Sequence, residues 1–167
     1  MFRLSRLACL ALSTTLFCAV WSNTAWRIGL WVWAGFAGCT CYFACPEKGM
    51  KAVGLCYVNA FTGFLYAIGT LALDQIFPST IGFIIIDLVL VFFMCYQAKI
   101  KLLSYTVGVF FGCFPTRAVD GNPKILICLA IGVILGLLCD KGGSFLYSKF
   151  GAPEIEADVA ESANVEV

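Results

Sequence analysis

One carboxylate stands inside an otherwise aliphatic stretch, because Asp87 has three aliphatic residues on each side of it. An ionised carboxylate in such surroundings costs several kcal/mol, so it must face a partner or a wet cavity. It could accept a proton, bind a cation or hold a donor group of a substrate. The competing interpretation is a protonated, hydrogen-bonded structural residue, since burial favours the neutral acid. On the same argument, the candidate polar wall residues are Asn59, Thr62, Tyr57 and Tyr66.

The chain contains ten cysteines and no histidine. Nearly all of these thiols lie in apolar segments, where a free cysteine behaves as a small apolar residue. Cys41 and Cys45 share a helix face at a spacing that could bind a soft metal, with Met94 as a further copper(I) ligand. We nevertheless predict no metal site and no cofactor. The lack of histidine removes the usual general base, and no Gly-x-Ser-x-Gly motif or phosphate-cradling loop occurs, so we predict that the protein is not an enzyme.

The composition identifies the class of protein. Of the 167 residues, 61% are apolar and 13% are charged, and the mean hydropathy is +0.92. Soluble domains carry about a quarter charged residues, so this chain could not cover a soluble globule of its size with polar side chains. A formal net charge of +1 provides no field that would attract nucleic acid. The sequence therefore predicts an integral membrane protein that contacts the lipid bilayer and no nucleic acid.

Charged residues fall in clusters that separate six apolar segments. Backbone amides in lipid must be satisfied within their own segment, so these segments are predicted to be helices. The third exceeds the roughly 20 residues that span a bilayer, whereas the first, fifth and sixth must recruit flanking residues or stop part-way. The predicted fold class is all-α, a polytopic membrane bundle of about six transmembrane helices. The segments are 7–21, 28–45, 52–73, 80–96, 102–114 and 125–139.

Stop signals separate these segments. Pro46, Pro78 and Pro115 are each expected to end a helix, because proline lacks the backbone N–H and clashes with the preceding turn. The stretch 120–123, Asp-Gly-Asn-Pro, is a turn sequence. Since the connections are short, consecutive helices are expected to be antiparallel neighbours.

Lysine and arginine counts in short loops predict the orientation of a membrane protein. With the N-terminus in the cytoplasm, eight basic residues lie on the inner side and three on the outer side, so both termini are predicted to be cytoplasmic. Residues 1–150 form the predicted transmembrane domain, and the acidic tail 151–167 is predicted to be disordered. A basic start before an apolar run also fits a cleaved signal peptide. Another apolar segment follows at once, however, and we keep the first segment as a helix.

Three helices on each side of the loop between Leu73 and Thr80 would cross the membrane in opposite senses, as in an inverted repeat. The second helix of each half is rich in glycine and is followed by a proline. Small residues four apart predict close helix packing or an oligomer contact, with a narrow glycine-lined pore as the alternative. These pairs are Ala34 with Gly38, Gly63 with Ala67, Ser104 with Gly108 and Gly112, and Gly132 with Gly136.

Residues 33–46, which read WAGFAGCTCYFACP, and residues 94–99, MCYQAK, are specific enough to suggest a family. With Gly49 and Lys51, they resemble the YcdZ-like family of bacterial inner-membrane proteins of unknown function. The resemblance implies a small polytopic protein of the inner membrane and brings no catalytic residue with it. Asp87 lies outside this motif. A role shared by the family is better placed on the motif itself, at Gly35, Gly38, Thr40, Tyr42 and Pro46.

Two functions remain open from the sequence. The first is a small-solute channel or secondary transporter, in which a small solute passes between the halves. The second is a non-transporting membrane protein that organises or regulates a membrane partner through its small-residue seams and acidic tail. A homo-oligomer is compatible with both. The path predicted for the first function is lined by Gly35, Gly38, Thr40, Asn59, Asp87, Gly108 and Gly112.

Overall fold

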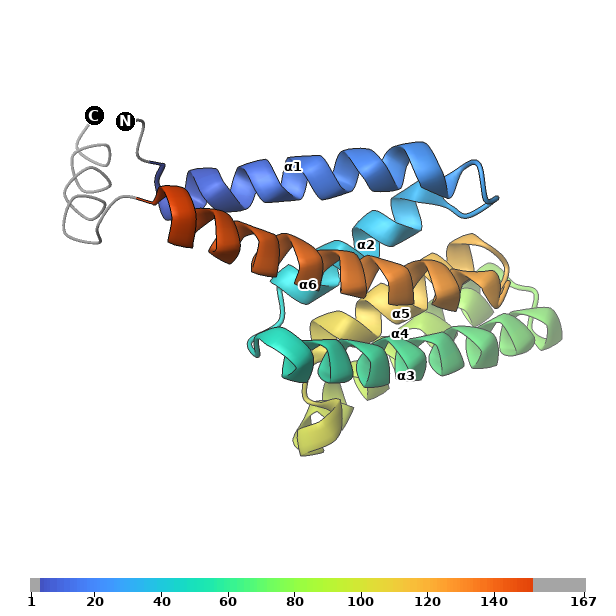
Figure 1. Ribbon diagram of the computed structural model, residues 1–167. Helices are drawn as coiled ribbons and strands as arrows, with labels where there is room; N and C mark the ends of the chain where they lie inside the picture. Colours follow the sequence, from blue (N-terminus) through green and yellow to red (C-terminus); the bar gives the residue numbers. More distant parts are fainter. Residues whose placement is uncertain (1–3, 152–167) are drawn as a thin grey trace, which may run out of the picture.

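A computed structural model describes residues 4–151, which form an all-α bundle (Figure 1). Each predicted apolar segment overlaps one α-helix, so the predicted fold class is confirmed. Two short 3-10 turns, η1 (Gln97–Lys99) and η2 (Lys101–Leu103), connect the fourth and fifth helices. The predicted tail lies outside the described residues except for Gly151. The helices are α1 (Arg6–Ala25), α2 (Val32–Phe43), α3 (Gly49–Ile76), α4 (Thr80–Tyr96), α5 (Thr106–Ala118) and α6 (Lys124–Phe150).

Four helical stretches are long and apolar enough to cross a membrane: α1, α3, α6 and α4 together with η1. Helices α1 and α6 include residues that flank the predicted segments, which is one of the two outcomes expected for short segments. In α1 the side chains of Asn23 and Thr24 donate to backbone carbonyls one turn earlier, at 2.9 and 2.8 Å. Polar groups at the helix end are thereby satisfied within the helix, and α1 reaches 20 residues.

The helices α2 and α5 are much shorter, with 12 and 13 residues. At 1.5 Å per residue each measures about 20 Å or less, whereas the hydrocarbon core of a bilayer is about 30 Å thick. For α2 this differs from the predicted segment 28–45. Gly29 adopts a positive φ of 70°, which turns the chain after α1, and the helix begins only after Trp31.

The proline signals are confirmed at two of three positions. Helix α2 ends before Pro46 and α3 ends before Pro78. The prediction that Pro115 ends its helix was wrong, because α5 continues through it to Ala118. The cost is small since only one further turn follows, and membrane helices tolerate such a proline. The predicted turn at 120–123 is confirmed, with positive φ at Asp120 and Gly121.

The helices do not pack in chain order. Helix α2 packs mainly on α6 and α3 mainly on α5, while α1 with α2 and α4 with α5 make few contacts. The prediction that consecutive helices are close neighbours was therefore wrong. The short connections limit how far successive helices can separate, but glycine-lined faces decide which pairs approach most closely.

Glycines make both main crossings possible. A Cβ atom at Gly112 would overlap the carbonyl oxygen of Ala60, and one at Gly38 would overlap that of Leu129. The backbones of α5 and α3, and of α2 and α6, are therefore in direct contact. The small-residue pairs therefore serve close helix packing at four glycines: Gly38, Gly63, Gly112 and Gly132.

The residues in contact at one crossing correspond to those at the other, with one spacing in the chain for the short helices and a second spacing for the long helices. Helices α1 and α4 begin 74 residues apart, and so do α2 and α5. In Figure 1, α1 and α4 run in opposite directions, as expected for inverted halves. The short helix of each half packs on the third helix of the other half. Corresponding residues are 74 apart on the short helices and 69 apart on the long ones: Gly35 with Val109, Gly38 with Gly112, Ala60 with Leu129, and Gly63 with Gly132.

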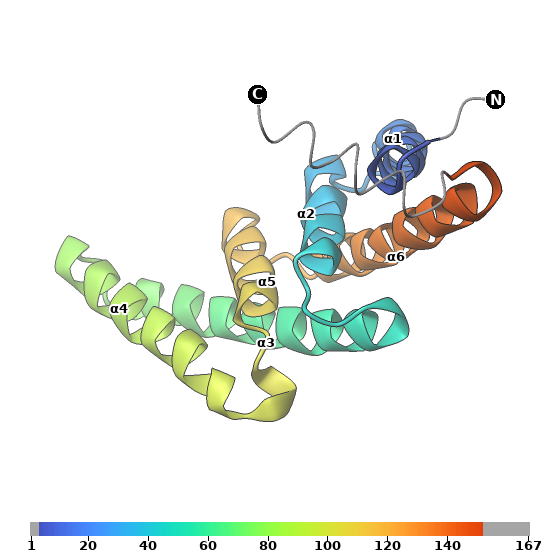
Figure 2. The same cartoon turned by 90° about the vertical axis from the view of Figure 1, so that its left-hand side faces the viewer.

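This exchange creates two packed units, each made of helices from both halves. We call α1, α2 and α6 the first unit and α3, α4 and α5 the second unit. In the first unit α1 lies closely on α6, since Gly142 and Gly143 face Ser13 and Leu10. In the second unit α4 diverges from α3 (Figure 2) and buries only Leu90 and Met94. The units are thus related in arrangement but differ in how tightly the outer helix is held.

Candidate functional site

A groove lies between the units, where the two short helices face each other. Trp33 and Ala37 of α2 form one wall, and α5 supplies the opposite wall. The groove has a volume of about 350 Å³ and an almost entirely apolar lining. None of the residues that line it carries a charged side chain. The α5 wall consists of Phe110, Phe111, Phe114, Pro115 and Ala118.

The four glycines predicted to line a path lie in close contacts inside the units. Gly35 and Gly38 face α1 and α6, Gly108 packs against the Tyr105 ring, and Gly112 meets α3. These glycines lie on the faces of α2 and α5 that point away from the groove. Thr40 is different, because it follows Trp33 and Ala37 at helical spacing and is exposed. Of the predicted residues on α2, Thr40 alone shares the face that lines the groove.

Asp87 belongs to a charged cluster that joins the three helices of the second unit. Arg117 of α5 donates from one guanidinium nitrogen to Asp87 of α4 and from the other to Asp74 of α3, the latter at 3.0 Å. The Asp87 side chain is 54% exposed and the Asp74 side chain 16%. The predicted intramembrane carboxylate therefore has a charged partner, which is one of the alternatives that the sequence left open.

The cluster carries two acids and one base, so its formal charge is −1. One oxygen of Asp74 is buried and has no hydrogen-bond partner among the described residues. In the first unit, Ser13 corresponds to Asp87 at the spacing of 74 residues, and Gly143 corresponds to Asp74 at the spacing of 69 residues. Small residues let α1 close onto α6 there, whereas charged side chains occupy the equivalent space between α3 and α4.

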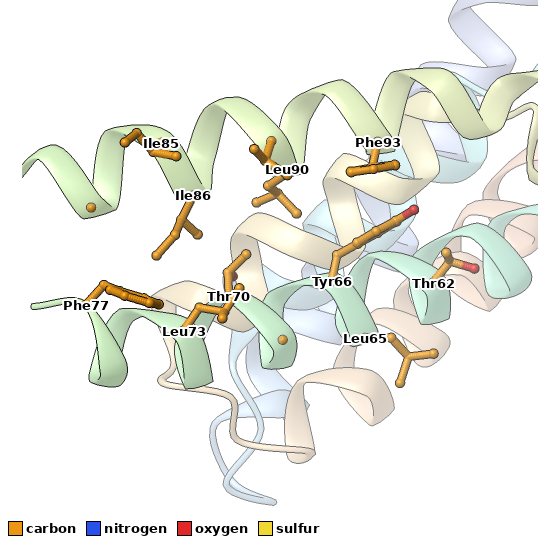
Figure 3. Close-up of a pocket in the computed structure, with 13 residues that line it drawn as sticks. Thr62, Leu65, Tyr66, Thr70, Leu73, Phe77, Ile85, Ile86, Leu90 and Phe93 are labelled. Carbon is orange, nitrogen blue, oxygen red and sulfur yellow. The ribbon is translucent and has the colours of Figure 1, made fainter.

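A second groove follows the divergence of α3 and α4 and has a volume of about 740 Å³. Figure 3 shows Ile86, Leu90 and Phe93 of α4 facing Tyr66 and Thr70 of α3. Thr62, one of the predicted polar wall residues, also lines it. Its hydroxyl donates to the carbonyl of Val58 at 2.8 Å, so the wall stays apolar. Such a surface suits hydrocarbon rather than a polar solute.

Two tyrosines tie the units together. The Tyr57 hydroxyl of α3 donates to the carbonyl of Ala130 in α6 at 3.0 Å. The Tyr105 hydroxyl donates to the carbonyl of Cys41, near the end of α2, at 2.6 Å. Asn59 is fully buried beside this junction and donates to the carbonyls of Leu55 and Leu102. Its side-chain oxygen has no partner in the described part of the chain, which leaves one acceptor free at the α3–η2 contact.

We expect Tyr105→Phe to destabilise the protein by about 1–3 kcal/mol, because it leaves a buried carbonyl acceptor with a weak thiol donor only. Tyr96→Phe, at an exposed tyrosine of α4, is the matched control and should have no such effect. The measurement is the free energy of unfolding of both variants and of the wild type in mixed micelles. Equal stabilities of the two variants would show that the Tyr105 bond does not hold the units together.

The copper(I) arrangement considered for Cys41, Cys45 and Met94 does not form. Cys45 lies beyond the end of α2, so Cys41 and Cys45 do not share a helix face. Met94 packs in the core of the second unit, beside Ala67 and Cys113. In its place, Cys41 approaches Cys56 of α3, whose thiol points to the Cys41 carbonyl at 3.6 Å.

The fold, with its four helical stretches long and apolar enough to cross a membrane, defines an all-α helical membrane protein. The chain belongs to the family described as protein of unknown function DUF1097, whose pattern matches residues 11–144. It is similar to inner membrane protein YcdZ of Escherichia coli K12, with 34% identity over 143 residues, 84% of this chain and 87% of the relative. YcdZ of Salmonella typhimurium LT2 is 33% identical over 84% of this chain and 89% of its own. No solved structure matches the chain.

Proposed function

We propose that the protein is a channel or secondary transporter that carries a small uncharged solute across the bacterial inner membrane, between its two units. The observation that carries the proposal is the apolar groove between α2 and α5. Each of these helices is too short to span the bilayer alone. Inverted repeats that place short helices at the contact between halves are a recurring plan of transport proteins.

The proposed orientation places both termini in the cytoplasm. The described ends of the chain lie together, since the backbone N–H of Leu4 donates to the carbonyl of Phe150 at 3.0 Å. The connections that carry Lys48, Lys99 and Lys101 lie at this same end of the bundle (Figure 1). The excess of basic residues there favours the cytoplasmic side.

We also propose that the protein is not an enzyme. No histidine is available as a general base, and the charged cluster consists of an arginine bonded to two aspartates. The arginine remains protonated and cannot serve as the base, and both aspartates accept hydrogen bonds from it. The chemistry of the cluster is therefore better suited to holding three helices together than to proton transfer during catalysis.

Ala37→Phe should lower the flux of small neutral solutes to that of empty liposomes, because the new ring would fill the groove from the α2 wall. Stopped-flow shrinkage of proteoliposomes with a panel of neutral and anionic solutes provides the measurement. Ala11→Phe adds the same ring to the exposed face of α1 and should leave the flux unchanged. Equal flux in both variants would contradict a path through this groove.

The alternative function is a protein that organises or regulates a membrane partner without transport. It is favoured by the outer face of α4, which exposes Ile81, Ile84 and Leu88 and which a second copy or another membrane protein could cover. Under this alternative, wild-type proteoliposomes show no flux above empty liposomes although the protein is folded. A complex that survives purification would then identify the partner.

A further inference from the structure

Three thiols from three different helices meet in the first unit. The sulfur atoms of Cys18 on α1, Cys39 on α2 and Cys139 on α6 all lie within 4.8 Å of one another. Cys39 and Cys139 are buried and Cys18 is half-buried. They are 21 and 100 residues apart in the chain, so no sequence spacing announces the cluster. Only the packing of the first unit brings them together.

The helices that carry these thiols pack closely on one another and are joined by hydrogen bonds. Gly38 lets α2 touch the backbone of α6, and Gly142 lets α6 approach α1 at Ser13. The Ser13 hydroxyl donates to the carbonyl of Cys139 at 2.9 Å, and the Trp21 ring nitrogen donates to the carbonyl of Val32 at 2.9 Å. The three sulfur atoms are thus positioned before any ligand arrives, which lowers the cost of binding one.

The surroundings are apolar. Trp21 and Leu135 are buried in the same cluster of side chains as Cys39 and Cys139, and Phe17 and Phe36 pack against it. No histidine or carboxylate joins the three thiols within the described residues. The available ligands are therefore sulfur only, and they number three.

This ligand set selects the kind of ion. Thiolates favour soft metals such as Cu(I), whereas structural zinc takes four ligands in a tetrahedron. Three sulfurs at about 2.3 Å from one ion, the length of a zinc–thiolate bond, would be about 4 Å apart, in keeping with the observed cluster. A monovalent ion that displaces one thiol proton leaves the site uncharged, which suits an apolar environment. A divalent ion would have to displace two.

We propose that Cys18, Cys39 and Cys139 form a binding site for one copper(I) ion. The ion joins α1, α2 and α6 in the first unit and releases a proton to water on binding. The site lies away from the groove between the units, and its existence does not depend on the transport of a solute.

The test compares two triple variants of the full chain in nanodiscs, reduced and kept free of oxygen. One replaces Cys18, Cys39 and Cys139 by serine. The matched control replaces Cys9, Cys113 and Cys128, which are three buried thiols outside the cluster. Titration of Cu(I) against a chromophoric chelator should give one tightly bound equivalent fewer in the first variant, and no loss in the control. Equal stoichiometry in both variants would overturn the proposal.

X-ray absorption on the copper-loaded wild type keeps the proposal testable if the triple variant does not fold. The expected spectrum shows copper with three sulfur neighbours and no nitrogen or oxygen neighbour. Cys18→Ser, at the least buried of the three thiols, should reduce the number of sulfur neighbours to two. A spectrum dominated by nitrogen or oxygen neighbours, or one that Cys18→Ser does not change, would contradict a three-sulfur site.

Discussion

Gly112→Ala is expected to cost at least about 3 kcal/mol of folding free energy, at the upper end of overpacking effects. A methyl group at this position would overlap the carbonyl oxygen of Ala60, which belongs to the backbone of α3 and cannot rotate away. The two helices must separate along their whole crossing. Because Gly38 occupies the corresponding place against Leu129, Gly38→Ala should have a similar effect in the first unit.

Gly54→Ala is the matched control, since a Cβ atom there meets nothing within 4 Å. Alanine is the better helix former by about 1 kcal/mol, so this variant should be as stable as the wild type or slightly more so. The measurement is the free energy of unfolding of the three variants and of the wild type in mixed micelles. If Gly112→Ala and Gly54→Ala were equally stable, direct backbone contact between α3 and α5 would be refuted.

Arg117→Gln is expected to destabilise the second unit by roughly 2–4 kcal/mol. Breaking a buried ion pair costs about 3–5 kcal/mol, and the cost is smaller here because Asp87 is 54% exposed. The substitution leaves two carboxylates close together without a cation, and α4 has few other contacts to hold it. Arg117→Lys should be intermediate, because a single ammonium group lacks the fork that reaches both acids.

Arg27→Gln removes an exposed cation from the α1–α2 connection and is the control for the loss of charge alone. The unfolding free energy of all three variants is the measurement, with the cleavage of α4 by an added protease as a second readout. Restoration of stability when Asp74→Asn and Asp87→Asn are added to Arg117→Gln would confirm that repulsion causes the loss. An Arg117→Gln protein as stable as Arg27→Gln would show that the cluster does not hold α4.

The sequence predicts the helices well because the cost of exposed backbone in lipid leaves no other structure for an apolar run. It also predicts that α2 and α3 end before Pro46 and Pro78, because a proline ring clashes with the preceding turn of a helix. It does not predict that α5 continues through Pro115, because the remaining turn is too short for the lost hydrogen bond to matter. The partner of each helix depends on matching glycines far apart in the chain, and these become apparent only when the crossings are known.

In the candidate site, too, the sequence indicates single residues but not their partners from other helices. Asp87 could be singled out from its aliphatic neighbours, but Arg117 and Asp74 could not be assigned to it, since both lie near the ends of other segments. The predicted path residues were chosen as small or polar, whereas the groove between the units is lined mainly by aromatic side chains. One observation in the sequence could have indicated which faces line the groove: Gly35 and Gly38 occupy one face of α2, while Trp33 and Ala37 occupy another.

The central claim is that water and solute reach the groove between α2 and α5. The most direct test is the reaction of Ala37→Cys in intact proteoliposomes with a small membrane-impermeant thiol reagent, located by peptide mass spectrometry. We predict that this cysteine reacts, while Ala11→Cys on the exposed face of α1 does not. Protection of both cysteines from the aqueous reagent, in a folded protein, would contradict a path between the units.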